Sequence, residues 1–289
     1  MDSTGLVLEG GGMRSAYTAG VLEFFLDSNI RFPYVIGVSA GASNACSYLS
    51  GQKGRNRKVG IDHVRDPRFL SFRNLFKEGS LFGMNFIYKE VPTNIEPLDV
   101  TSISTCPERF VIVTTDCQTG EPYYIDHSDD IELLDAVRAS SSLPFIAPMV
   151  QFKGKELLDG GIADPIPLRK AFNDGFEQNL VVLTQPKGYR KKPYKLKKLA
   201  EKLYPQHEKL IQSIFSRHLR YNQAMEEVEK LEEKGRIKVL RPSREACITF
   251  IEKDETKLTS LYEAGYKDAK SSYEDIMPWL ERKAVAIAK

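Results

Sequence analysis

The chain has 289 residues, of which 42% are hydrophobic, and its 41 basic and 39 acidic residues leave a formal net charge of +2. This length allows one large domain with an appendage, and the hydrophobic content is sufficient for a core. The near-neutral charge argues against a nucleic-acid-binding protein, and we expect no membrane-spanning helix because no run of about 18 apolar residues occurs.

The N-terminus and the cysteines indicate the cellular compartment. Residues 1–4 (MDST) carry an acid where a secretory signal would carry bases, and a strand-like run follows at once, so we expect the mature protein to begin here. The four cysteines lack the spacing of a metal or redox site, which favours free thiols in a cytoplasmic protein. They are Cys46, Cys106, Cys117 and Cys247.

The first predicted element is a short strand, residues 6–8 (LVL), which leads into the glycine-rich turn 10–14 (GGGMR) and a predicted helix over 16–26. Glycines at a helix N-terminus expose backbone N–H groups that bind anions, either the phosphates of a nucleotide or the oxyanion of an ester under attack. Ser15 stands where the dinucleotide fingerprint requires glycine, and no Gly-Lys-Ser or Gly-Lys-Thr occurs, which weakens the nucleotide interpretation. A turn without a ligand is the remaining alternative, disfavoured because open α/β sheets place their sites at strand ends.

A second predicted strand and helix, residues 34–38 and 42–49, flank the sequence GVSAG at 37–41. A serine within a glycine bracket between strand and helix is typical of a nucleophile elbow, which presents the hydroxyl at the tip of a tight turn. The glycines permit the sharp bend, and the helix dipole favours negative charge at that point. Ser39 is therefore the candidate nucleophile, and the alternative is that it only caps the helix.

Residues 51–96 are polar and rich in aromatic side chains. This composition fits either a cap with an acyl-binding role or the core of a peripheral helical segment. We expect most of these aromatic side chains to be core. They are Phe69, Phe72, Phe76, Phe82, Phe86 and Tyr88.

A carboxylate follows an apolar run in the second half of the chain. Residues 157–161 (LLDGG) place Asp159 next to permissive glycines, so that its side chain can approach a neighbouring loop and accept the proton of Ser39. The alternative is an ordinary β-turn, of which Asp-Gly is a common signature. Further strand-like runs alternate with helical patterns, which predicts a three-layer α/β/α fold with a mainly parallel central sheet. These runs are 110–114, 150–152 and 180–183.

Taken in order, these motifs resemble the patatin-like phospholipase family of the bacterial type over roughly residues 4–185. The sequences GVL at 20–22, ASSSLP at 139–144 and DPIP at 164–167 add to the resemblance. It implies a Ser-Asp catalytic dyad in a patatin-like fold, with Ser39 as nucleophile and Asp159 as general base. Arg14 matches the basic residue that commonly ends the glycine loop, and Ser15 departs from the glycine that members usually keep. The implied oxyanion hole is Gly10, Gly11 and Gly12, and the supporting glycines are Gly37, Gly41, Gly160 and Gly161.

A histidine-based triad is the alternative mechanism. The order Ser, acid, His of α/β-hydrolases is met formally if Asp116 or Asp126, and then His207, follow the candidate serine. We expect His207 on the surface, however, because its segment is highly charged, and the segments around His63 and His127 have the polar composition of turns. No histidine pair has the spacing of a zinc site, so we predict neither a metal nor a cofactor.

The C-terminal region, 186–289, is expected to be a charged and mostly helical extension of a catalytic domain over 1–185, with one edge strand at 237–240. It begins with a basic segment, for which a solvated connector is the favoured interpretation. The alternative is peripheral contact with anionic headgroups at the inner face of a membrane. The basic residues concerned are Lys187, Arg190, Lys191, Lys192, Lys195, Lys197 and Lys198.

These observations predict a serine acyl hydrolase that cleaves carboxylic esters of lipids through an acyl-enzyme intermediate, with phospholipase A, lysophospholipase or esterase activity. Two alternatives use the same fold: a lipid-binding or regulatory protein with little turnover, and an acyltransferase with the same dyad. The sequence leaves open the headgroup, the acyl-chain length, the positional preference, the oligomeric state and the physiological role.

Overall fold

The computed structural model describes residues 4–128, 132–243 and 248–281, so that Cys247 lies outside the described part of the chain. Within these residues, eight strands form one sheet in the order β5-β6-β3-β2-β1-β7-β8, and β4 pairs with β3 off this path. The strands are β1 (Thr4–Leu8), β2 (Tyr34–Val38), β3 (Arg109–Asp116), β4 (Pro122–Asp126), β5 (Val150–Phe152), β6 (Lys155–Asp159), β7 (Gln178–Val182) and β8 (Ile237–Leu240).

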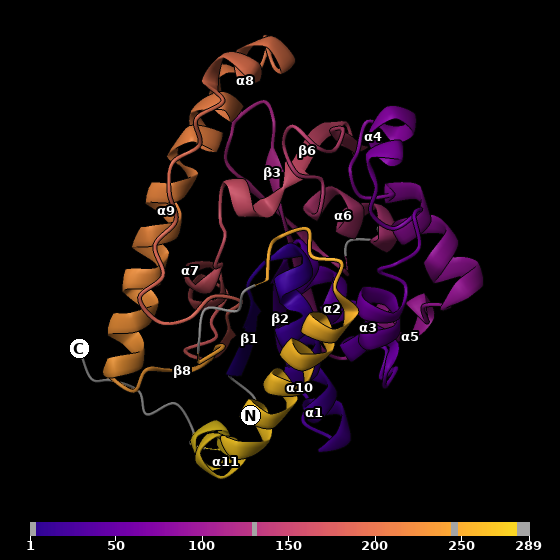
Figure 1. Ribbon diagram of the computed structural model, residues 1–289. Coiled ribbons are helices and arrows are strands. Elements are labelled where there is room, and N and C mark those ends of the chain that lie inside the picture. Colours follow the sequence, from indigo (N-terminus) through magenta and orange to yellow (C-terminus); the bar gives the residue numbers. More distant parts are fainter. Residues whose placement is uncertain (1–3, 129–131, 244–247, 282–289) are drawn as a thin grey trace.

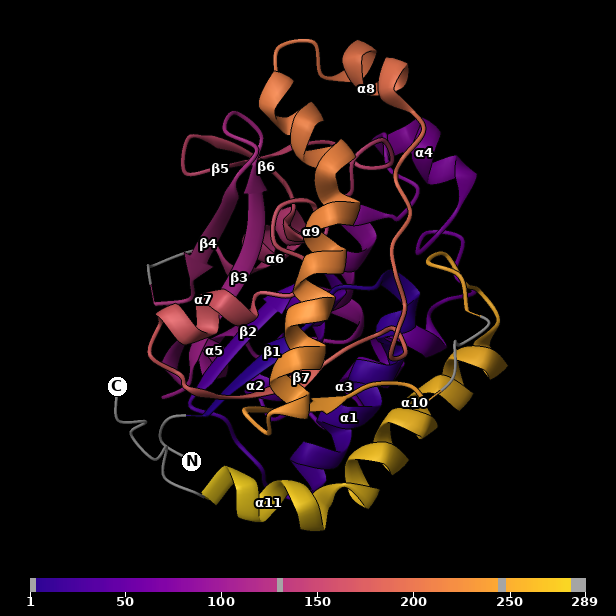
Figure 2. The same ribbon diagram turned by 90° about the vertical axis from the view of Figure 1, so that its left-hand side faces the viewer.

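Helices lie on both faces of this sheet (Figures 1 and 2). The α-helices are α1 (Ala16–Asp27), α2 (Ala40–Leu49), α3 (Arg55–Arg57), α4 (Phe72–Glu78), α5 (Val100–Thr105), α6 (Leu133–Ser140), α7 (Leu168–Asn173), α8 (Lys197–Leu203), α9 (Glu208–Glu233), α10 (Glu255–Ser271) and α11 (Tyr273–Glu281). Short 3-10 helices occur at η1 (Gly12–Ser15) and η4 (Gly160–Ile162), and π-helical segments at η2 (Lys58–Asp62) and η3 (Phe86–Ile95).

The neighbouring strands β3, β2, β1, β7 and β8 pair in parallel, whereas β4, β5 and β6 make antiparallel pairs at one side of the sheet. The predicted three-layer fold with a mainly parallel sheet is confirmed. β8 lies at the sheet edge, where the sequence indicated an edge strand. The sequence did not predict β4 and β6, because Pro122 and Asp126 at the ends of β4 are typical turn residues and β6 begins with the charged Lys155.

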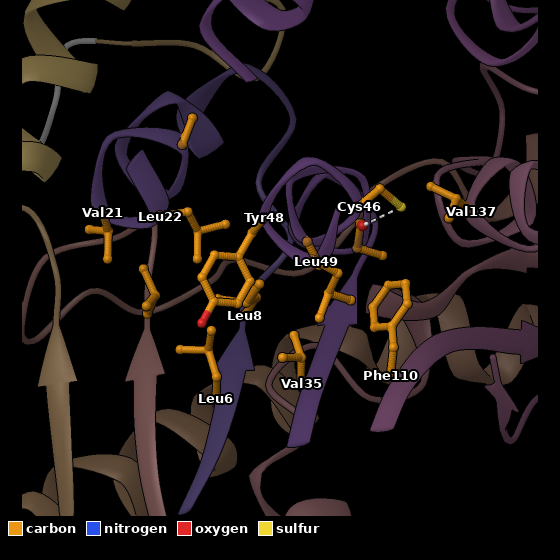
Figure 3. Packing of buried hydrophobic residues seen from close by; sticks show 14 of the residues in the cluster. Leu6, Leu8, Val21, Leu22, Val35, Cys46, Tyr48, Leu49, Phe110 and Val137 are labelled. Carbon is orange, nitrogen blue, oxygen red and sulfur yellow. Dashed lines mark hydrogen bonds between the residues drawn. The ribbon is translucent and has the colours of Figure 1, made fainter. Parts of the chain in front are cut away.

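Alternation along each strand divides the core between the two faces of the sheet. Leu6, Leu8 and Val35 point to the face covered by α1, α2 and α10 (Figure 3). Val7 and Ile36 point to the other face, where they pack with side chains of α7 and α9. Both faces are therefore covered by helices, as a parallel sheet requires.

Helix α10 crosses α1 with the two backbones in close contact. A Cβ atom on Gly20 would lie 1.9 Å from the carbonyl oxygen of Tyr262, and one on Gly265 would lie 2.1 Å from the carbonyl oxygen of Tyr17. Across the same interface, the Tyr17 hydroxyl donates a hydrogen bond to Asp268 at 2.9 Å. The C-terminal helices therefore depend on glycine at two positions to cover the same face of the sheet as α1.

The aromatic segment 51–96 is only partly core. α4 packs through Asn74, which is buried, whereas Phe72 and Phe76 on the other side of this helix are 75% and 90% exposed. The expectation that most of these aromatic side chains are core is confirmed, and these two residues are the exceptions. The aromatic side chains that do pack into the core are Phe69, Phe82, Phe86 and Tyr88.

Candidate active site

Ser39 lies at the junction of β2 and α2 in a strained backbone conformation, with φ 55° and ψ −125°. Such a conformation costs a non-glycine residue about 1–3 kcal/mol, so surrounding contacts must hold it. A Cβ atom on Gly37 would lie 2.8 Å from the backbone nitrogen of Ala42, and one on Gly41 would lie 2.7 Å from the carbonyl oxygen of Leu8. The glycine bracket thus allows β1, the turn and α2 to pack backbone against backbone.

A second buried serine holds the turn in place. The Ser39 N–H donates to Ser140 Oγ at 2.8 Å, and the Ser140 hydroxyl donates to the carbonyl oxygen of Val113 at 2.6 Å. Ser140 ends α6 and Val113 belongs to β3, so a single hydroxyl ties the elbow to two other elements. Sequence reasoning assigned no role to Ser140, and the only signal for it was its place in the ASSSLP motif.

The register of β3 brings Asp159 to Ser39. β2 runs parallel to β3 and ends with Val38 opposite Val113. β6 runs antiparallel to β3 and ends with Asp159 opposite Thr114. β4 pairs with β3 along one edge at both positions. β2 and β6 therefore both pair along the other edge of β3, one after the other, and their ends meet there. The serine after β2 and the aspartate at the end of β6 therefore become neighbours.

Asp159 is a buried carboxylate with one oxygen free. It is 2% exposed and Ser39 is 6% exposed. Asp159 Oδ1 accepts the Gly161 N–H at 2.7 Å, and Oδ2 has no hydrogen-bond partner among the described residues. Burial raises the pKa of Asp159, while the positive charge of Arg217 and the nearby Ser39 hydroxyl act in the opposite direction. The buried carboxylate therefore keeps one oxygen available as a hydrogen-bond acceptor.

The glycine loop lies directly against the serine. A Cβ atom on Gly10 would lie 3.0 Å from the Cβ of Ser39. The N–H groups of residues 10–12 donate to no acceptor among the described residues, whereas the next N–H, that of Met13, donates to the carbonyl oxygen of Phe250 at 3.2 Å. Free N–H groups beside a candidate nucleophile are what an oxyanion hole requires.

Ser15, which departs from the family pattern, closes the loop. Its hydroxyl donates to the carbonyl oxygen of Gly12 at 2.7 Å, and its own carbonyl oxygen accepts the side-chain amide of Asn44 at 3.1 Å. Gly12 has a positive φ of 55°. The hydroxyl therefore stabilises the turn that precedes α1 and leaves the free N–H groups of the loop unobstructed.

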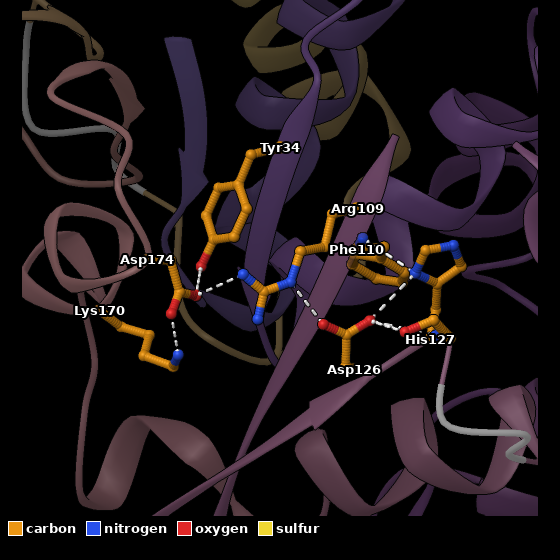
Figure 4. Close-up of polar contacts among 8 residues, drawn as sticks. Tyr34, Arg109, Phe110, Asp126, His127, Lys170 and Asp174 are labelled. Atoms are coloured by element: carbon orange, nitrogen blue, oxygen red, sulfur yellow. Dashed lines mark hydrogen bonds and ion pairs between the residues drawn. The ribbon is translucent and has the colours of Figure 1, made fainter. Parts of the chain in front are cut away.

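Figure 4 shows the surroundings of Asp126, one of the two acids of the formal triad, and of the adjacent His127. His127 Nδ1 accepts the Phe110 N–H at 3.0 Å, and Asp126 pairs with Arg109 at 2.5 Å. Arg109 is the first residue of β3, whereas the elbow lies beyond the last residue of the parallel strand β2. This pair is therefore at the opposite end of the sheet from the candidate nucleophile.

The other members of the formal triad have different partners. His207 is half-buried rather than on the surface, and its Nε2 lies 2.8 Å from Glu156 Oε2. Asp116 pairs with Lys155 at 2.6 Å. Among the described residues, no histidine lines either of the cavities at Ser39. The structure does not bring the triad together.

Two cavities meet at Ser39. The larger, about 150 Å³, is lined mostly by apolar side chains and includes Phe69, Phe82 and Tyr88, so these aromatics are both core and cavity wall. The smaller, about 20 Å³, is polar and is lined by Asp159 together with three basic residues. These three are Arg14, Lys191 and Arg217.

The basic segment divides between the surface and the site. Lys187 pairs with Glu233 at 3.8 Å and Arg190 pairs with Glu229 at 2.8 Å, whereas Lys191 is half-buried in the wall of the polar cavity. The exposed remainder is Lys192, Lys195, Lys197 and Lys198. Sequence reasoning missed the site roles of Lys191 and Arg217, because no motif links either residue to the elbow.

The described residues hold no group of three or more His, Cys, Asp or Glu side chains that could bind a metal ion. Within the same part of the chain, every helix is too short or too polar to cross a bilayer. Cys46 and Cys117 are buried free thiols and Cys106 is half-buried.

The sequence profile of the patatin-like phospholipase family matches residues 6–172, which is more than half of the chain. The chain therefore belongs to the patatin-like phospholipase family, as the motifs indicated. A second profile, a domain of unknown function (DUF6363), matches residues 207–281, which comprise α9, β8, α10 and α11.

Two curated relatives and one solved structure are similar to the chain. The uncharacterized protein YjjU of Escherichia coli (strain K12) is 30% identical over 195 residues, which cover 63% of this chain and 52% of YjjU. The probable lipid hydrolase 463L of Invertebrate iridescent virus 6 is 25% identical over 179 residues, which cover 56% of this chain and 61% of that protein. The chain thus spans between half and two thirds of these relatives. The crystal structure of VipD from Legionella pneumophila has a TM-score of 0.54 at 11% identity, covers 95% of this chain and 67% of VipD, and shares the fold.

Proposed function

We propose that this protein is a serine hydrolase that cleaves carboxylic ester bonds of lipids through Ser39 and Asp159. The observation that carries the proposal is a strained serine at the junction of two cavities, with a buried carboxylate that has one free oxygen in the wall of the smaller cavity. Membership of the patatin-like phospholipase family and similarity to a probable lipid hydrolase support the same class of reaction.

The geometry suits a two-step acyl transfer. Ser39 Oγ attacks the ester carbonyl carbon while its proton passes to Asp159 Oδ2, and the N–H groups of residues 10–12 stabilise the oxyanion. The bond to the alcohol then breaks, and the alcohol leaves with the proton held by Asp159. In the second step Asp159 takes a proton from water, the water oxygen attacks the acyl carbon, and Ser39 recovers its proton as the carboxylic acid leaves.

A carboxylate is a weak base for a hydroxyl group, so most of the rate must come from stabilising the oxyanion. Removing one oxyanion donor typically costs about 100- to 1000-fold in turnover. Burial raises the pKa of Asp159, which makes the carboxylate a stronger base and narrows its mismatch with the serine hydroxyl. The apolar cavity at Ser39 offers room for the acyl chain.

The test is hydrolysis of short-chain aryl esters and a phospholipid panel, combined with covalent labelling of Ser39 by a fluorophosphonate. Ser39→Ala and Asp159→Ala are expected to abolish hydrolysis, and Ser39→Ala also removes labelling. Single changes of His127 or His207 to Ala should retain hydrolysis, because neither lines the cavities. Loss of hydrolysis on a histidine change alone would contradict the dyad.

The same assay separates the alternatives. A lipid-binding or regulatory protein would bind lipid but leave Ser39 unlabelled. An acyltransferase would label and then transfer its acyl group to an added alcohol in preference to water, which product analysis detects.

We also propose peripheral contact with an anionic membrane surface, through α4 and α8. Figures 1 and 2 place both helices at the end of the molecule toward which β1 and β2 run. α4 exposes Phe72 and Phe76, and α8 with the residue before it exposes Leu196, Leu199 and Leu203. The lysines among these leucines would attract anionic headgroups, and each basic residue at the membrane surface contributes about 1 kcal/mol to binding.

Vesicle sedimentation tests this contact with a matched control. The variant Phe72→Ser, Phe76→Ser is expected to bind phosphatidylglycerol-containing vesicles at least tenfold more weakly, because burying each Phe contributes about 1.5–3 kcal/mol. Leu219→Ser removes an exposed apolar side chain of α9, 61% exposed, and should leave binding unchanged. Equal vesicle binding by both variants would remove α4 from the contact surface.

A further inference from the structure

The polar cavity beside Ser39 holds three cationic side chains without a carboxylate partner. Arg14, Lys191 and Arg217 all line it, and none forms an ion pair with an acidic residue in the described part of the chain. The neighbouring cations of the same segments behave differently, since Lys187 and Arg190 pair with glutamates of α9. The cavity therefore brings three cationic side chains together with two carboxylates, Glu9 and Asp159, and leaves an excess of positive charge without an ion pair among the described residues.

Two acidic side chains, Glu9 and Asp159, line the cavity together with these cations, and Glu9 is already hydrogen-bonded. Glu9 Oε1 accepts the Tyr221 hydroxyl at 2.8 Å, and Oε2 accepts the Thr184 N–H at 2.6 Å. The Lys191 ammonium group lies 4.0 Å from the centre of the Tyr221 ring, a cation–π contact. The ammonium group of Lys191 has no hydrogen-bond partner among the described residues, so it remains able to bind an anion.

Two elements hold Lys191 and Arg217 in place. Figure 2 shows the connector between β7 and α8 running beside α9. The Lys191 N–H donates to Asn222 Oδ1 at 2.7 Å, and the Asn222 amide donates back to the carbonyl oxygen of Lys191 at 3.1 Å. Arg217 donates through Nε to the carbonyl oxygen of Gly161 at 2.6 Å and through Nη1 to the Tyr194 hydroxyl at 3.0 Å. The backbone of Lys191 and the guanidinium group of Arg217 are therefore held in place without a ligand.

Repulsion among the three cationic side chains favours the binding of an anion between them. The pKa of Lys191 is well below its ordinary value, first because of burial and then because of the positive charges of Arg217 and Arg14, although Glu9 acts in the opposite direction. An anion placed among the three side chains would relieve this repulsion.

The two cavities separate the two halves of an ester. They share Ser39, Leu143 and Phe250 as lining residues and otherwise diverge. An acyl chain in the apolar cavity leaves its ester carbonyl at Ser39, so the alcohol portion extends into the polar cavity. That cavity measures about 20 Å³, room for about one water molecule, so a group larger than water that reaches the cations requires the side chains around it to move apart.

We propose that the polar cavity is a phosphate subsite, in which Lys191 and Arg217 bind a phosphate carried on the alcohol side of the scissile ester. This inference rests on the proposed function and adds a charge requirement to it. Arg pairs with phosphate through two parallel hydrogen bonds and Lys through a point charge. A phosphomonoester suits three cations best, whereas a choline headgroup would bring a further positive charge to them. Both residues lie outside the part of the chain that matches the family profile, residues 6–172.

Lys191 is the residue to change, because Arg217 also acts on the pKa of Asp159 more strongly than Lys191 does. The substrates are a lysophosphatidic acid, a lysophosphatidylcholine and a monoacylglycerol with one common short acyl chain, each below its critical micelle concentration so that no membrane takes part. The quantity compared is the ratio of kcat/KM for the phosphomonoester to kcat/KM for the neutral ester. The matched control is Lys192→Gln, a change at the adjacent and exposed lysine.

We expect the wild type to prefer the phosphomonoester at least tenfold over the neutral ester, with the choline ester between them. Lys191→Gln should lower this ratio at least tenfold, mainly through KM, and Lys192→Gln should leave it unchanged. Equal ratios in the two variants, or a wild type without preference, would overturn the subsite while hydrolysis of the neutral ester upholds the proposed function.

A binding measurement decides the case in which no ester is hydrolysed. sn-Glycerol 3-phosphate and inorganic phosphate are titrated calorimetrically into the Ser39→Ala protein, with and without Lys191→Gln. Binding of sn-glycerol 3-phosphate that is tighter than that of inorganic phosphate and depends on Lys191 supports a headgroup subsite. Absence of binding, or equal binding of both ligands with no effect on the substrate ratio, overturns it.

Discussion

Ser140→Ala removes one hydroxyl that the structure uses twice, as acceptor for the Ser39 N–H and as donor to the carbonyl oxygen of Val113. Ser140 is fully buried, so alanine leaves the Ser39 N–H without water or another partner. An unpaired buried group costs about 1–3 kcal/mol, and the lost bond to Val113 adds about 1 kcal/mol. We expect the free energy of unfolding, measured by urea denaturation, to fall by about 2–4 kcal/mol.

The same change should slow the chemistry. The backbone strain at Ser39 amounts to about 1–3 kcal/mol, and Ser140 is one of the contacts that maintain it. If the turn relaxes by that amount, the population of the reactive conformer falls by about 5- to 150-fold. The second-order rate of fluorophosphonate labelling and kcat/KM for a soluble aryl ester should decrease together by a factor in this range.

Ser142→Ala is the matched control. Ser142 is also fully buried, but its hydroxyl donates only to the carbonyl oxygen of Arg138 one turn earlier, at 2.9 Å. Its loss should cost about 0.5–1.5 kcal/mol and leave the labelling rate near that of the wild type. A Ser140→Ala protein that is labelled as fast as Ser142→Ala would refute the account of how the elbow is held.

Three further predictions address the fold, the carboxylate and the apolar cavity. Gly265→Ala should lower the free energy of unfolding by about 3 kcal/mol, because α10 must move away from α1. Gly60→Ala is the control and should not lower it, because no atom lies within 4 Å of the added Cβ. Equal stabilities of the two variants would contradict the close crossing of the helices. The pKa of Asp159 is raised in the folded protein, so its ionisation destabilises the fold as the pH rises from the unfolded-state pKa of 3.8 toward the folded-state pKa. Asp159→Asn should therefore raise the melting temperature at neutral pH, and this increase should vanish below pH 3.8. Asp116→Asn should lower the melting temperature at neutral pH, because burial raises the pKa of Asp116 less than hydrogen bonds from Lys155 and two backbone N–H groups lower it. Melting curves between pH 3 and 8 compare the two variants, and a lower melting temperature for Asp159→Asn at neutral pH would contradict the prediction. Ile87→Trp narrows the apolar cavity and should lower kcat/KM for long-chain relative to short-chain esters about tenfold, whereas an unchanged chain-length profile would place the acyl chain elsewhere.

The local parts of the site could be read from the sequence. Residues 37–41 predicted a turn between strand and helix, and the structure has that turn with Ser39 at a positive φ. Residues 10–12 predicted free N–H groups at the start of a helix, and these groups have no acceptor among the described residues. Both features depend on the conformational preferences of a few consecutive residues, which a short stretch of sequence contains.

Only the tertiary structure decided which distant residues meet. Asp159 reaches Ser39 because β2 and β6 end head to head beside β3, and an Asp-Gly turn elsewhere on the surface would have the same local sequence. Within one basic run, Arg190 pairs with α9 while Lys191 lines the polar cavity, a difference that the bonds between the connector and Asn222 determine. Local sequence patterns predict which chemical groups are present. The distances between these groups depend on strand register and helix packing, which the whole chain determines.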